Sequence, residues 1–154
     1  MFDAPIFELF NTCKIGAVMA LIFRWWLIVF GVTVAGIALA HLLFGQVTYI
    51  GGGDVNATMD SDLRVFNVLF LAYGLAFVWA AQDVGGRARV IDLLGLLFFV
   101  GALGRLLSWA TVGPPNWFYI AMIAVEFIVP IVNYVAVRRL AAAPESRIRT
   151  TLAT

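Results

Sequence analysis

Residues 25–45, WWLIVFGVTVAGIALAHLLFG, decide the fold of this chain, because none of them carries a formal charge when His is neutral. At about 1.5 Å of rise per residue, a helix of this length crosses the roughly 30 Å hydrocarbon core of a bilayer. Its apolar side chains occupy nearly every face, whereas a surface helix of a soluble protein keeps a polar stripe toward water. The stretch therefore predicts a transmembrane helix.

Three further stretches have the same character: residues 65–82, 93–112 and 117–137. The third and fourth spans each hold one charge, Arg105 and Glu126, and the sequence GPPN at residues 113–116 separates them by a tight turn. Two successive prolines end a helix because they remove N–H donors and fix φ. Pro130, inside the fourth span, is expected to kink it. The pattern predicts an all-α membrane protein folded as an antiparallel four-helix transmembrane bundle.

The composition favours the same class of protein. Of the 154 residues, 63% are hydrophobic and 12% are charged, against about half and a quarter in ordinary soluble chains. A net charge of +1 with 10 Lys and Arg argues against nucleic-acid binding, which needs clustered positive charge. One Cys and one His are too few for a multi-ligand metal or haem site, and enzyme motifs are missing. We therefore expect no cofactor, no metal site and no catalytic residues.

Basic residues divide unevenly between the two sides of the predicted bundle. One side holds Lys14, Arg24, Arg87, Arg89, Arg138, Arg139, Arg147 and Arg149; the other holds Arg64 beside Asp54, Asp60 and Asp62. Cytoplasmic loops carry the excess of Lys and Arg, so both termini are predicted in the cytoplasm, with the chain in the inner (cytoplasmic) membrane. Residues 1–24 form an interfacial helix or extend the first span, residues 25–137 form the membrane domain, and residues 138–154 form a basic tail.

Arg105 and Glu126 lie at membrane depth, where an ionisable side chain deserves a functional hypothesis. Their helices are neighbours across the tight turn, and side chains lean toward the N-terminus of their own helix, so the two lean toward each other. Three roles stay open for them: a structural ion pair, part of the lining of a polar ligand or lipid site, or a proton relay. The relay is the weakest of the three, because a neighbouring Arg keeps a carboxylate ionised.

An outer polar cluster, made of Asp60, Asp62 and Arg64, opens the second span. Asp60 or Ser61 is expected to be the N-cap, with Asp62 in the first turn, where acidic groups satisfy free N–H groups and the positive end of the helix. Alternatively, Asp62 reaches Arg105 and forms a network with it and Glu126.

Small residues form ridges on two of the predicted spans, and such ridges let helices approach closely in a membrane. They either pack the bundle or dock a partner protein, and the apolar N-terminal segment offers a second docking surface. The docking candidates are Phe7, Phe10, Gly31, Ala35, Gly101 and Gly104.

The sequence resembles a bacterial family of small four-helix membrane proteins known only as a domain of unknown function. The resemblance covers residues 25–137 and rests on SDLR at residues 61–64, GALGRLLS at residues 101–108, GP at residues 113–114, and Glu126 with Pro130. It implies the bundle architecture but no activity. Arg64, Arg105 and Glu126 match the polar positions of the family.

In size and layout, the chain is also similar to the small lipid-uptake coordinator subunits of Mce-type lipid importers. That similarity implies a non-enzymatic accessory subunit of a larger inner-membrane complex that transports lipids, with membrane lipids and the complex as partners. The alternative is a small stand-alone carrier or lipid-binding protein that uses an intramembrane pocket at Arg105 and Glu126.

Overall fold

The computed structural model describes the backbone of residues 4–152 and the side chains of residues 15–142. Its elements are α1 (Ala4–Phe44), the short 3-10 helix η1 (Gly45–Thr48), α2 (Ala57–Ala80), α3 (Ala88–Val112) and α4 (Trp117–Leu152). Each of the four α-helices is long and apolar enough to cross a membrane. The prediction of an all-helical, multi-pass membrane protein is confirmed to that extent.

Three helices begin earlier than their uncharged stretches: α1 at Ala4, α2 at Ala57 and α3 at Ala88. The backbone of residues 4–24 continues directly into the first span as part of α1, so the structure has an extended helix rather than a separate one. In α2 the N-cap is Asn56, whose side chain accepts a hydrogen bond from the N–H of Met59 at 2.9 Å. The expectation that Asp60 or Ser61 caps this helix is therefore wrong, because charged residues are tolerated inside a first turn that already has a cap.

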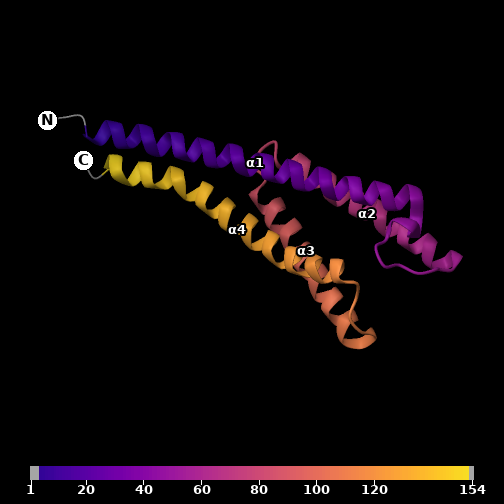
Figure 1. Ribbon diagram of the computed structural model, residues 1–154. Helices are drawn as coiled ribbons and strands as arrows, with labels where there is room; N and C mark the ends of the chain where they lie inside the picture. Colours follow the sequence, from indigo (N-terminus) through magenta and orange to yellow (C-terminus); the bar gives the residue numbers. More distant parts are fainter. Residues whose placement is uncertain (1–3, 153–154) are drawn as a thin grey trace.

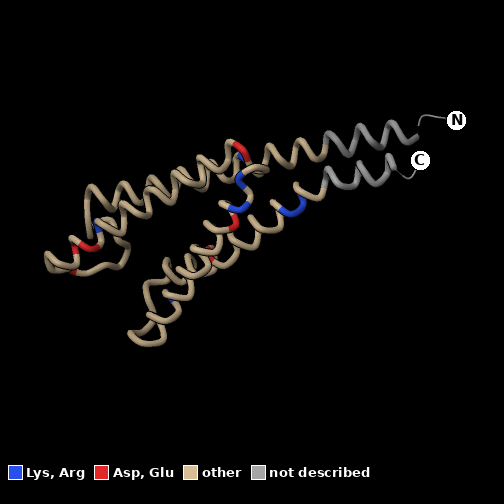
Figure 2. The backbone as a smooth tube through the Cα atoms, turned by 180° about the vertical axis from the view of Figure 1, so that it is seen from behind, with Lys and Arg blue, Asp and Glu red and all other residues tan. Residues whose placement is uncertain are grey.

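The helices associate in two pairs (Figure 1). α1 packs along α2 and α3 along α4, whereas helices of different pairs meet over shorter stretches. Figure 1 shows the pairs diverging away from the side on which N and C are marked. In Figure 2, long stretches of every helix carry no charged residue, as a hydrocarbon environment requires.

The main core lies near the connection between α2 and α3, a region we call the α2–α3 end. All four helices contribute buried side chains to this core: Phe23, Leu27, Phe77, Ala80, Ala81, Ile91, Leu94 and Val137. The opposite region, around the turn between α3 and α4, is called the α3–α4 end. The core therefore joins the two pairs at the α2–α3 end. The helices at the α3–α4 end depend on contacts other than this core.

Glycines set the close packing within the α1/α2 pair. A Cβ added at Gly31 would lie 2.6 Å from the carbonyl oxygen of Gly74, and one added at Gly74 would lie 2.6 Å from the backbone nitrogen of Ala35. These distances are too short for any side chain, and small residues at a helix interface allow such an approach of two backbones.

Candidate polar site in the α3/α4 pair

The ion pair between Arg105 and Glu126 is the centre of the candidate site. The Nε of Arg105 donates to Oε1 of Glu126 at 2.8 Å and to Oε2 at 3.0 Å. The Glu126 side chain is 5% exposed, whereas that of Arg105 is 40% exposed. The structure thus brings together the two intramembrane charges predicted from the sequence, with the acid buried and the base partly open.

Helical spacing places both residues. Glu126 lies one turn from Ile123 and one turn from Val129, and all three are buried, so Glu126 belongs to the inward face of α4. On α3, the buried residues Leu94 and Phe98 share a face that reaches Arg105 two turns further along. The face that packs in the core near the α2–α3 end therefore carries a charge near the α3–α4 end.

The outer part of the Arg105 guanidinium has no protein partner among the described residues. All of the hydrogen bonds that the structure gives this side chain come from Nε. The ring of Tyr119 lies on one side, with its centroid 5.4 Å from Cζ. The site therefore offers N–H donors of a cation to an acceptor beyond the described residues.

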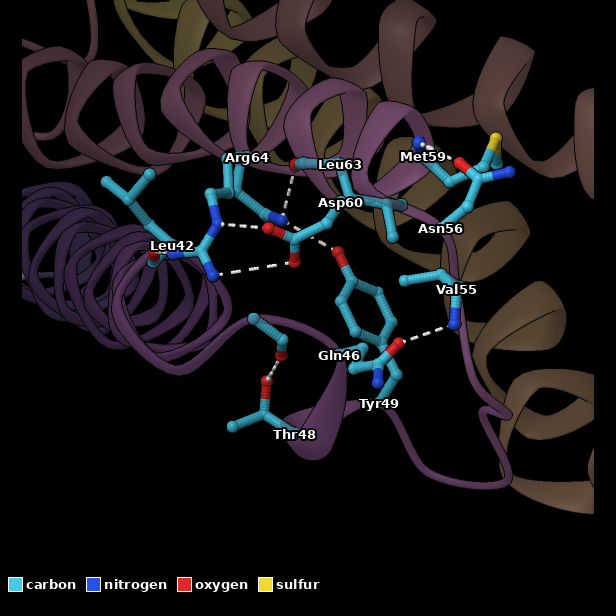
Figure 3. A network of polar contacts seen from close by, with 12 residues as sticks. Leu42, Gln46, Thr48, Tyr49, Val55, Asn56, Met59, Asp60, Leu63 and Arg64 are labelled. Atoms are coloured by element: carbon cyan, nitrogen blue, oxygen red, sulfur yellow. Dashed lines mark hydrogen bonds and ion pairs between the residues drawn. The ribbon is translucent and has the colours of Figure 1, made fainter.

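The outer polar cluster is built around Arg64 rather than Asp62 (Figure 3). The Nε of Arg64 donates to Asp60 at 2.8 Å, and Nη1 donates to the carbonyl of Leu42 at 2.7 Å, so this side chain ties α2 to the end of α1. Asp62 is exposed and takes part in none of the ion pairs formed by the described side chains. The alternative network of Asp62 with Arg105 and Glu126 is absent from these contacts.

Uncharged polar residues add contacts in the same region, and one of them, Asn67, was missed from the sequence. Asn67 is buried and donates to the hydroxyl of Tyr49 and the carbonyl of Leu63, each at 2.7 Å. His41 stacks on Tyr49 with ring centroids 4.0 Å apart and shares a hydrogen bond with Thr48. An amide near the start of the apolar span at residues 65–82 was the available signal for Asn67, but it was overlooked because the spans were identified by formal charge.

Two further polar contacts join the helix pairs, and they too were missed. The Nε1 of Trp26 donates to Oδ1 of Asn133 at 3.0 Å, from α1 to α4. The hydroxyl of Tyr73 donates to the carbonyl of Leu94 at 2.6 Å, from α2 to α3. Asn133 is 1% exposed, and its Nδ2 has no hydrogen-bond partner among the residues that the structure describes. These contacts fix the relative position of the pairs on the same side as the core.

The docking candidates have different environments. Gly31 and Ala35 are buried against α2, whereas Gly101 and Gly104 are exposed and nothing lies within 4 Å of a Cβ added at either. Phe7 and Phe10 have side chains outside the described residues. Within residues 15–142, no group of three or more His, Cys, Asp or Glu could hold a metal ion.

Fold and site define a helical, multi-pass membrane protein with a paired Arg and Glu inside its α3/α4 pair. The chain belongs to the family described as a domain of unknown function, DUF4345, which matches it over residues 22–137. The match includes both charges of the pair and confirms the resemblance to a family of unknown function. No curated protein and no solved structure matches the chain, and no comparison supports the similarity to lipid-importer subunits.

Proposed function

We propose that this protein is a non-enzymatic accessory subunit of a larger bacterial inner-membrane complex, one that transports lipids. The observation that carries the proposal is an uncovered face of α3, formed by Leu97, Gly101, Gly104 and Ser108. These residues follow helical spacing, and all four are exposed.

The two glycines of this face are the main argument. Gly in a helix costs about 1 kcal/mol relative to Ala, and within the α1/α2 pair the close approach of two backbones accounts for Gly31. Gly101 and Gly104 have no such neighbour among the described residues. A helix of another membrane protein, approaching closely along this face, would give them the same role.

The proposed topology leaves little protein outside the membrane to act alone. With both termini in the cytoplasm, as the distribution of basic residues favours, the outer connections are residues 45–56 and 113–116. Transport of lipids as the task of the complex rests on the similarity in size and layout to coordinator subunits of Mce-type importers.

Purification from native membranes tests this proposal. A tagged chain extracted in mild detergent is expected to bring a stoichiometric membrane-protein partner, and Gly104→Leu is expected to reduce its recovery at least tenfold. Gly36→Leu is the matched control, because Gly36 is also exposed and has nothing within 4 Å of an added Cβ.

Two outcomes would contradict the proposal. One is recovery of the unaltered chain as a lone monomer, which would favour the stand-alone lipid-binding alternative. The other is equal recovery of the partner with Gly104→Leu and with Gly36→Leu, which would mean that the α3 face is not the docking surface.

A further inference from the structure

The face of α3 that packs between the helix pairs is covered only in part. Leu94, Phe98 and Ala102 are buried, and the ring of Phe98 lies 5.5 Å from that of Phe30 on α1. Gly101, next to Ala102, is already exposed, and about one turn further along Arg105 is 40% exposed. The α1/α2 pair, which diverges from α3/α4 in Figure 1, therefore leaves the last turns of this face to the surrounding solvent.

That solvent is lipid over most of the length of α3. Arg105 precedes the last residue of the helix, Val112, by seven positions, which corresponds to about 10 Å along the axis. A long Arg side chain at this depth can extend toward the boundary where lipid headgroups lie. The Nη groups, which no described residue accepts from, are thus within reach of a headgroup but too deep for bulk water.

A phospholipid supplies what the site lacks. Its phosphate oxygens are acceptors that pair strongly with a guanidinium, and one of its tails can occupy the space one turn away at Gly101, where nothing lies within 4 Å of an added Cβ. The Nε of Arg105 donates to both oxygens of Glu126, so the Nη groups are left to donate to the phosphate.

We propose that the Nη groups of Arg105 bind the phosphate of a phospholipid, with a tail of that lipid lying beside Gly101. The acid Glu126 is then a positioning residue, which orients the guanidinium through Nε. This inference does not depend on an accessory role: a partner helix packed along the α3 face would take the place of the tail beside Gly101, so the lipid site belongs to the chain free of its partner.

Lipid retention by the purified full chain tests the site. The protein is exchanged in detergent containing equal amounts of phosphatidylglycerol and uncharged diacylglycerol, washed, and analysed by native mass spectrometry. We expect about one phosphatidylglycerol per chain, retained at least tenfold over diacylglycerol. Addition of inorganic phosphate should leave it bound, because the tails contribute to binding.

Substitutions distinguish the loss of lipid binding from the loss of the fold. The paired substitution Arg105→Gln with Glu126→Gln removes both charges without leaving either one unpaired, and Gly101→Leu fills the space for the tail while keeping both charges. Each should lower phosphatidylglycerol retention at least tenfold, with circular dichroism and gel filtration unchanged. Gly36→Leu and Arg138→Gln are the controls, the second because Arg138 also pairs with a carboxylate, that of Asp92, at 2.9 Å.

Three results would overturn the inference. They are equal retention of the two lipids by the unaltered chain, release of the bound lipid by inorganic phosphate alone, and unchanged retention in the folded charge-free variant. A partner protein that is lost from the charge-free variant while lipid retention stays the same would assign the Nη groups to an acidic side chain of that partner instead.

Discussion

Both helix pairs contain glycines, but the surroundings of these glycines differ between the α1/α2 pair and the α3/α4 pair. In α1/α2, Gly31 and Gly74 bring two backbones into contact, with an added Cβ as close as 2.6 Å to the facing helix. In α3/α4, a Cβ added at Gly95 would lie 3.5 Å from Pro130, an ordinary contact, and Gly101 and Gly104 face nothing. Small residues in a membrane helix therefore indicate a close approach without saying whether the approaching helix belongs to the same chain.

The pairs also differ in how they carry charge. Arg64, in α2, lies near a helix end and donates to Asp60 and to a carbonyl of α1. Arg105, in α3, lies deeper and donates to one carboxylate, leaving part of its guanidinium open. The guanidinium of Arg64 is therefore used in contacts between α1 and α2, whereas that of Arg105 can still donate to a further acceptor.

The largest expected loss of stability comes from placing a side chain at Gly31, where α1 contacts α2. Gly31→Leu should destabilise the protein by about 3 kcal/mol or more, because overpacking against a backbone cannot be relieved by a rotamer change. Unfolding of the purified protein in mixed detergent measures this loss. Gly36→Leu, on the open side of the same helix, should change stability little; equal losses in the two variants would show that α1 does not contact α2 through Gly31.

A smaller effect is expected at the α3/α4 ion pair. Glu126→Leu should cost about 2 kcal/mol, below the usual range for a buried pair because Arg105 is partly exposed. Adding Arg105→Leu should recover part of the loss, since no charge is then left without a partner. A double-mutant cycle of unfolding free energies measures the coupling, and strict additivity would rule out a pair that contributes to stability.

A still smaller loss of stability is expected from removing the hydrogen bond that joins α1 to α4. Trp26→Phe removes the N–H that Asn133 accepts and should cost about 1 to 2 kcal/mol, because Asn133 is left unpartnered in a buried place. Trp25→Phe is the matched control, since Trp25 is exposed. Unfolding of both variants compares them, and an equal cost would mean that the Trp26 bond does not hold the pairs together.

The smallest expected change in stability is that of a Gly→Ala substitution, and its sign differs between the two pairs. Gly104→Ala should stabilise the isolated chain by up to about 1 kcal/mol through helix propensity alone, because nothing lies near the added methyl group. Gly31→Ala should destabilise it, because the methyl group meets the backbone of Gly74. Thermal unfolding of the two variants side by side checks the signs, and a matching sign would remove the distinction between the pairs.

Much of the site could be predicted because charge in an apolar span is conspicuous. Arg105 and Glu126 stand alone in their spans, and the short turn between those spans limited their partners. Asn67 and Asn133 could not be placed in the same way, because an amide does not interrupt an apolar stretch and its partners, Tyr49 and Trp26, lie far away in the sequence. The start of α2 was predicted a few residues too late, because Asp60 or Ser61 was chosen as the N-cap and the cap that Asn56 provides was overlooked.

From the sequence alone came the helical class, the four segments able to cross a membrane, and the two charges that lie inside it. These follow from local properties, since the length of an uncharged stretch and the cost of a charge in hydrocarbon do not depend on the rest of the fold. Tertiary structure alone decided which glycines are covered, where the two helix pairs touch, and which edge of Arg105 stays open. Those features depend on contacts between residues distant in the chain. The periodic pattern of one helix does not indicate which other helix packs against it.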